Sequence, residues 1–379
     1  MRVPAPLLRF LLLLIVVAAV IGLRQPDKVL YPQFWAEDAS IFYLEAEHLG
    51  TDSLWHPYNG YWHAYSRSFA WAGTRIPIRL LPAWYALAGL VATVLALHAA
   101  LRLWPPSAHL ARAAAVGVVV LAPFTDELWL TLTNSQWFGA LLLVAELAGP
   151  APLHATTALC RLGLVAVMAL SGPFGLLLLP VAAWRAWWHR DAWSRGLLAT
   201  FAAAAAVTAL ALAHHPRTAA ATGLADRVGE LWSVITASPL RAGVLSGGMS
   251  LLVATMAVGV GRRRWPVVAC SVGSLCLVAV TLATVPPTQL VAGRYMFVPW
   301  VCGLWAALLL ASEGMRRAWL PVALALGLAL ARFRLPAMQH YDWASDAACL
   351  EAREACDMLV NPGWPVGLPG RGPLPPEPR

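Results

Sequence analysis

The stretch LGLVAVMALSGPFGLLLLPVAAW, residues 162–184, decides how this chain folds. It joins two apolar runs, 155–171 and 174–188, through the short segment SGPFG. Pro173 has no backbone N–H and disfavours helical geometry at the residue before it, so a helix is expected to end here. We therefore predict two helices with a turn at Gly172-Pro173, and not one long kinked helix.

The composition indicates the environment of these helices. The chain has 379 residues, of which 59% are hydrophobic and 12% charged. A soluble domain cannot bury so much apolar surface, whereas repeated apolar runs are typical of an all-α polytopic membrane protein. The net charge of +8 does not indicate nucleic-acid binding, because the Arg residues lie in short segments between apolar runs. The first run, 7–23, is interpreted as a retained helix and not as a cleaved signal peptide.

Eleven apolar runs are the expected helices of a transmembrane bundle. They are 7–23, 80–103, 111–124, 136–149, 155–171, 174–188, 196–213, 244–260, 265–285, 297–311 and 318–331. The basic segments are Arg2/Arg9, Arg102/Arg112, Arg185/Arg190/Arg195, Arg262–Arg264 and Arg316/Arg317. With a turn at Gly172-Pro173 they all fall on one side of the membrane. The positive-inside rule makes that side cytoplasmic, with the N-terminus inside and the C-terminus outside.

Several runs are short for a hydrocarbon core that is about 30 Å thick. Short helices persist in a membrane where protein or a wet cavity satisfies their backbone groups. We therefore expect residues 1–331 to form a transmembrane domain with a recess open to the outer face. Residues 332–379 are expected to form a short outward tail.

The tail carries two cysteines in an outward position. Along one continuous helix, Cys349 and Cys356 would lie about 10.5 Å apart, which is beyond the reach of a disulfide. A disulfide between them therefore requires the helix to end before Cys356. The Pro- and Gly-rich residues 361–379 are expected to be extended or disordered.

The first outward loop, 24–79, is expected to carry short amphipathic helices and most of the polar chemistry. Glu37 and Asp38 lie at the start of a predicted helix over 36–48. Adjacent helical positions point about 100° apart, so the two carboxylates cannot share one task. We assign Asp38 as a catalytic base and Glu37 as its support; the alternative is a pair of solvated charges.

Further candidates for substrate binding lie in three outward segments. Aromatic and polar side chains crowd the first loop in the way that carbohydrate sites do. An Arg on the outward side calls for a partner, and a guanidinium matches the oxygens of a lipid phosphate. Hydrated helix ends and snorkelling to headgroups are the alternatives. The candidates are Trp62, His63, Arg67, Asp126, Glu127, Arg294 and Tyr295.

This arrangement resembles the GT-C class of integral membrane glycosyltransferases. The resemblance is carried by the acidic pairs Glu37-Asp38 and Asp126-Glu127, by Arg294-Tyr295, and by the strings TNSQWFGALLL, SGPFGLLLLP and AGRYMFVPW. It implies a bacterial inner-membrane enzyme that transfers a sugar from a polyprenyl-phosphate donor to a glycan or lipid acceptor on the periplasmic face. A carboxylate would act as general base and the anomeric configuration would invert. Some members use a divalent cation, Mg or Mn, for which Asp38 and Asp126 are the candidate ligands.

Two other classes share these features. A transporter or flippase of a lipid-linked sugar would need the same cavity and phosphate-binding Arg, but no base. A non-catalytic subunit of an envelope-assembly complex would carry the outward acids incidentally. No phosphate-binding glycine loop, His-Glu-x-x-His or Gly-x-Ser-x-Gly motif occurs, so ATP-driven transport and hydrolase chemistry lose support.

Overall fold

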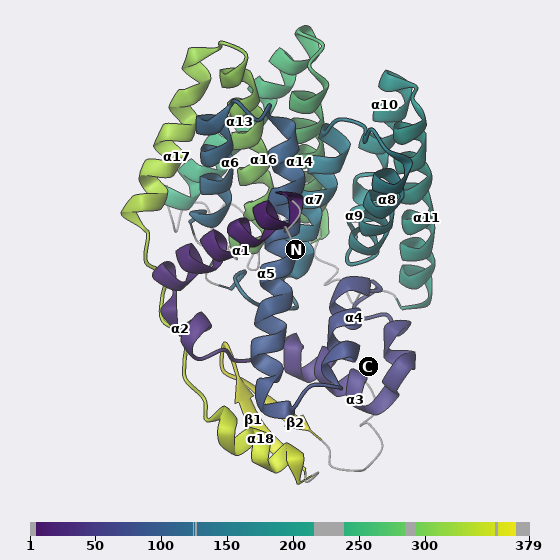
Figure 1. The fold of residues 1–379 in the computed structure, drawn as a ribbon, viewed down its shortest axis with the longest axis vertical. Coiled ribbons are helices and arrows are strands. Elements are labelled where there is room, and N and C mark those ends of the chain that lie inside the picture. Colours follow the sequence, from purple (N-terminus) through teal and green to yellow (C-terminus); the bar gives the residue numbers. More distant parts are fainter. Residues whose placement is uncertain are drawn as a thin grey trace.

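A computed structural model describes residues 5–123, 125, 127–215, 239–284, 293–352 and 355–368. The described residues are mainly helical, and one two-stranded sheet lies near the C-terminal end (Figure 1). The apolar helices are α1 (Ala5–Arg24), α5 (Leu81–Ala100), α6 (His109–Val120), α7 (Ser135–Ala148), α8 (Ala155–Ala169), α9 (Phe174–Leu177), α10 (Leu179–His189), α11 (Ala192–His214), α13 (Pro239–Gly261), α14 (Trp265–Thr284), α16 (Gly293–Ser312) and α17 (Trp319–Ala331). Each of the predicted apolar runs therefore overlaps at least one of these helices.

The remaining elements are short and mostly gather below the bundle in Figure 1. They are α2 (Pro26–Leu30), η1 (Asp38–Tyr43), α3 (Leu44–Leu49), η2 (Gly50–Leu54), α4 (Ala64–Gly73), η3 (Ile78–Leu80), η4 (Leu101–Leu103), η5 (Arg316–Ala318), α18 (Trp343–Glu351), β1 (Cys356–Val360) and β2 (Trp364–Leu368). The helix predicted over 36–48 is present as η1 and α3. We call the end of the bundle that carries the first loop and the tail the loop end.

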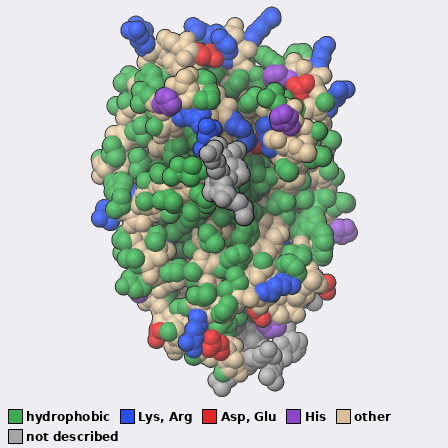
Figure 2. Space-filling model, viewed as in Figure 1, with side chains coloured by type: hydrophobic (Ala, Val, Ile, Leu, Met, Phe, Trp, Pro, Cys, Tyr) green, Lys and Arg blue, Asp and Glu red, His purple; other side chains and the backbone are tan. Residues whose placement is uncertain are grey.

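Helix length and surface character are those of a membrane protein. Among the described residues, four segments are long and apolar enough to cross a bilayer: Leu7–Arg24, Ile78–Leu103, Ala192–His214 and Arg294–Ser312. The 12-residue α6 and the 14-residue α7 are short, as predicted. Figure 2 shows a broad hydrophobic band between a Lys- and Arg-rich upper end and a lower end with both charge signs. The recess on the outer face remains a prediction.

The predicted turn at Gly172-Pro173 is confirmed. Helix α8 ends at Ala169 and α9 begins at Phe174. Arg161, in the middle of α8, bonds to the Pro150 carbonyl just after α7, and Arg185, near the end of α10, bonds to the Leu147 carbonyl in the last turn of α7. At the tip of the turn, Ser171 Oγ accepts a 2.8 Å hydrogen bond from the Tyr65 amide in the first loop. The chain therefore runs down α8 and returns through α10, as Pro173 requires.

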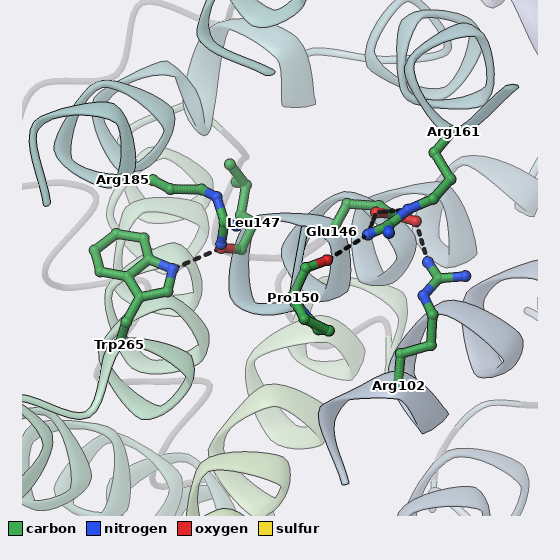
Figure 3. Close-up of polar contacts among 7 residues, drawn as sticks. All are labelled: Arg102, Glu146, Leu147, Pro150, Arg161, Arg185 and Trp265. Atoms are coloured by element: carbon green, nitrogen blue, oxygen red, sulfur yellow. Dashed lines mark hydrogen bonds and ion pairs between the residues drawn. The ribbon is translucent and has the colours of Figure 1, made fainter. Parts of the chain in front are cut away.

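A buried ion cluster lies at the opposite end of the bundle, which we call the Arg-rich end (Figure 3). Glu146 on α7 is 1% exposed and pairs with Arg102 and Arg161, with Arg161 Nε at 2.9 Å. Arg185 and Trp265 both donate to the Leu147 carbonyl, the indole at 2.7 Å. Cations at a helix C-terminus are stabilised by its dipole and satisfy its free carbonyls. The cluster thus satisfies the C-terminal end of α7 and ties four other helical segments to it: η4, α8, α10 and α14.

Replacing Glu146 tests this cluster. Glu146→Gln leaves two partly buried guanidinium groups without their anion, which typically costs about 3–5 kcal/mol. We expect the free energy of unfolding in detergent micelles to fall by that amount. Glu313→Gln is the matched control, because its partner Arg264 lies at the same end and is 53% exposed. Such exposed pairs contribute about 0–1 kcal/mol, so equal losses in the two variants would contradict the assignment.

At the loop end, one buried Arg joins three helices. Arg24, the last residue of α1, is 1% exposed. Its guanidinium donates to the Val120 carbonyl at 2.6 Å, to Ala122 at 3.0 Å and to Phe333 at 3.0 Å. These carbonyls lie at or just beyond the C-terminal ends of α6 and α17, where the dipole favours a cation. The three helices therefore end at one level.

The tail differs in part from the prediction. A disulfide joins Cys349 and Cys356, whose Cα atoms are 6.1 Å apart, and α18 ends between them at Glu351. Residues 364–368 are extended, as expected, but they also pair with β1 in an antiparallel hairpin that Val360 and Trp364 close. The reason is long-range: Asn361 Nδ2 donates to Gln33 Oε1 at 2.7 Å, which anchors the turn to the first loop.

Candidate functional site

The site is built on Asp38, which joins the two acidic outward segments. Asp38 is 1% exposed and accepts four hydrogen bonds. Thr133 donates its amide at 2.7 Å and its hydroxyl at 2.6 Å to Oδ1, while the Leu132 amide donates to Oδ2 at 3.3 Å. The amide of Trp35 adds a 3.4 Å contact to Oδ2. The carboxylate therefore fastens η1 to the segment that leads into α7.

This environment argues against Asp38 as the catalytic base. Burial raises the pKa of Asp38 to about 6, and the hydrogen bonds from Thr133 and Leu132 oppose that rise. Both oxygens already accept hydrogen bonds from the protein, and the side chain is shielded from solvent. A base must reach the proton that it abstracts. The contacts of Asp38 are those of a structural anchor, and its assignment as the base stays a prediction.

Glu37, the neighbouring carboxylate, is only partly buried. Burial raises its pKa; the positive charge of Arg294 lowers it and the negative charge of Glu127 raises it. Ala36, which precedes it, has φ +36, a conformation rarely adopted by a residue with a side chain. The amide of Ala36 donates to the Asn361 carbonyl of the tail at 2.7 Å. The tail thus helps to hold the backbone turn that presents Glu37.

Arg294 and Glu127 form the charged half of the site. Arg294 Nη1 lies 2.7 Å from Glu127 Oε2, and the two side chains are 29% and 15% exposed. The guanidinium also lies 5.1 Å from the centre of the Tyr295 ring. The outward Arg predicted to need a partner has therefore found one in the second acidic segment. Three predicted residues, Glu37, Glu127 and Arg294, are close enough to influence one another electrostatically.

An aromatic wall adjoins this pair. The indole of Trp137, in the first turn of α7, meets the Tyr295 ring edge-on at 5.3 Å and the Phe174 ring at 5.6 Å. Neither Trp137 nor Phe174 was among the predicted site residues. Both residues lie in the strings TNSQW and SGPFG, which the sequence analysis singled out. No local sequence pattern, however, indicated that these two segments would meet at Tyr295.

Three other predicted residues belong to the internal packing of the first loop. Arg67 is 1% exposed and pairs with Glu45 at 2.6 Å. The ring of His63 is 5% exposed and packs against Phe42 at 5.5 Å. Trp62 donates its indole N–H to the Leu54 carbonyl. These contacts explain the crowding of aromatic and polar residues there without a bound sugar.

The described residues offer no convincing metal site. Asp126 lies outside the described residues. Within the described ranges, no group of three or more His, Cys, Asp or Glu side chains is arranged to hold a metal ion. The oxygens of Asp38 already accept protein hydrogen bonds, and Glu127 is paired with a cation. A divalent cation held by Asp38 and Asp126 therefore stays a prediction.

Comparison with known proteins adds no assignment: no family model, curated protein or solved structure matches this chain. The resemblance to the GT-C class therefore rests on the layout of the helices and on the short motifs. The chemistry of the site has to be argued from its own residues.

The anchor role of Asp38 is testable through stability. Asp38→Asn replaces one hydrogen-bond-accepting oxygen by an NH2 group that faces protein donors. A buried polar group left unsatisfied costs about 1–3 kcal/mol. We expect the free energy of unfolding to fall accordingly. Thr133→Val should cost less, because it removes one of the donors. Effects in the double variant should be smaller than the sum. An Asp38→Asn protein of full stability would contradict the anchor role.

Proposed function

We propose that the protein is a membrane glycosyltransferase that moves a sugar from a polyprenyl-phosphate donor to a glycan or lipid acceptor. The observation that carries the proposal is the partly buried Glu37 beside the Arg294–Glu127 pair, at the loop end of an apolar bundle. A carboxylate with a raised pKa suits a general base. A partly exposed guanidinium at the edge of the apolar band suits a lipid phosphate.

The position of helix starts also favours an anion. Helices α7 and α16 both begin at the site, with Trp137 and Arg294 in their first turns. The N-terminal end of a helix carries partial positive charge and free N–H groups. A phosphate at Arg294 would be stabilised by these groups in addition to the guanidinium.

The proposed reaction is a single displacement. The acceptor hydroxyl oxygen forms a bond to the anomeric carbon while the bond from that carbon to the phosphate oxygen breaks. The leaving electron pair departs with the polyprenyl phosphate, whose charge Arg294 stabilises. Glu37 takes the hydroxyl proton. One displacement without a covalent intermediate inverts the anomeric configuration.

The distribution of Arg residues supports an orientation for this enzyme. The Arg-rich end would face the cytoplasm of a bacterium, and the loop end would face the periplasm. Eleven crossings, with α8 and α9–α10 as the two arms of a hairpin, satisfy that orientation. Residues 1–331 would then form the membrane domain, and the tail would lie over the periplasmic face.

Activity is tested with purified protein in nanodiscs, radiolabelled polyprenyl-phosphate sugars and membrane extract as the source of acceptor. Glu37→Gln and Arg294→Gln are each expected to lower transfer by roughly 100-fold or more. Glu351→Gln is the matched control, since this carboxylate at the loop end is 44% exposed and pairs with Arg79. Full transfer by Glu37→Gln would refute the base assignment. Movement of the donor across the bilayer without sugar transfer would favour a flippase. Absence of both activities would favour a non-catalytic assembly subunit.

The pH dependence gives an independent readout. Glu37 acts as a base only when ionised, so transfer should fall as the pH drops through its pKa. Because burial raises that pKa, the acid limb is expected above the usual range of a carboxylate. Arg294 lowers the pKa of Glu37 and Glu127 raises it. The residual activity of Arg294→Gln should therefore show its acid limb at a higher pH than the wild-type protein. The acid limb of Glu127→Gln should lie at a lower pH than that of the wild-type protein. An unmoved limb would exclude Glu37.

A further inference from the structure

Two buried polar atoms beside Arg294 have no hydrogen-bond partner among the described residues. They are Glu127 Oε1 and Trp137 Nε1. The other oxygen of Glu127 is the one that pairs with Arg294, at 2.7 Å. Leaving a buried donor or acceptor unsatisfied costs about 1–3 kcal/mol. An orphan acceptor and an orphan donor at one site are what a polar ligand would satisfy.

The two atoms belong to one continuous group of contacts. Trp137 meets Tyr295 at 5.3 Å, and Arg294 lies over the same Tyr295 ring at 5.1 Å. The backbone connects them as well. Asn134 Nδ2 donates to the Glu127 carbonyl at 2.9 Å, and the Trp137 amide donates to the Asn134 carbonyl at 3.1 Å. A rigid turn therefore carries both side chains toward the start of α16.

The chemistry of this group matches a hydroxylated ring. A sugar hydroxyl donates one hydrogen bond and accepts others, so neighbouring hydroxyls can serve a carboxylate oxygen and an indole N–H together. Aromatic side chains supply the apolar contact that sugar rings also need. A phosphate attached to that ring would meet Arg294 next to it.

We propose that Glu127 Oε1 and Trp137 Nε1 form a hydroxyl-binding subsite for the sugar ring of the lipid-linked donor. This inference rests on the proposed function and adds the residues that recognise the sugar, separately from the phosphate. It assigns Trp137 as a substrate-binding residue and gives Glu127 a second role besides its pairing with Arg294.

The test uses a substitution that removes little else. Trp137→Phe deletes the indole N–H and keeps an aromatic ring against Tyr295. Trp104→Phe is the matched control. Trp104 is 3% exposed and its Nε1 also lacks a partner within the described part of the chain, but it follows η4 at the Arg-rich end. Thermal unfolding of each variant checks that it is folded.

Binding is measured in nanodiscs with tritiated polyprenyl phosphate and its glucosyl, galactosyl, mannosyl and arabinosyl derivatives. The wild-type protein should bind at least one glycosylated probe more tightly than bare polyprenyl phosphate. Trp137→Phe should reduce that sugar-dependent gain by roughly 3- to 10-fold and leave the affinity for the bare lipid unchanged. Trp104→Phe should change neither affinity.

The outcomes separate the subsite from the proposed function. If the wild-type protein binds and transfers a sugar while Trp137→Phe keeps the full gain, the subsite is wrong and the glycosyltransferase stands. An equal loss in Trp104→Phe also refutes the subsite. If no probe binds the wild-type protein, both the donor assignment and the subsite are wrong.

Discussion

The hydrogen bonds of Asp38 are the constraint on which the loop end depends. A carboxylate buried among apolar helices is tolerated only when its oxygens are satisfied. Asp38 meets that condition by binding Leu132 and Thr133, which lie 94 and 95 residues further along the chain. This link fixes η1 against the start of α7. Glu37 on one side and Glu127 on the other are then brought to the same place.

The adjacent carboxylates of the first loop show how position determines chemical role. Asp38 faces inward, where backbone amides and a hydroxyl occupy its oxygens. Glu37 faces the charged side chains of Arg294 and Glu127, close enough for both to act on its pKa. One carboxylate therefore holds the loop in place, and the other stays partly exposed beside two charged side chains. Their order in the sequence is no guide to which does which.

The Arg-rich end also contains a buried carboxylate, and here guanidinium groups satisfy it. Glu146 is buried between Arg102 and Arg161, while Arg185 satisfies a carbonyl at the end of α7. Free helix carbonyls and a buried carboxylate together accept the guanidinium groups. The ion pairs of the described residues thus lie at the two ends, and the hydrophobic band of Figure 2 lies between them.

Local chemistry was enough to predict the helices, the turn at Pro173 and the need for α18 to end between its cysteines. Apolar runs must form helices in a membrane, and proline breaks them, whatever lies around them. Candidate residues such as Glu127 and Arg294 were also visible, since outward charges beside apolar runs are few. Long-range packing decided the rest. The anchoring of Asn361 to Gln33, the contact of Trp137 with Tyr295, and the difference in burial between Asp38 and Glu37 depend on segments distant in the sequence. No local pattern encodes such contacts, because burial and hydrogen-bond partners exist only once the helices have packed.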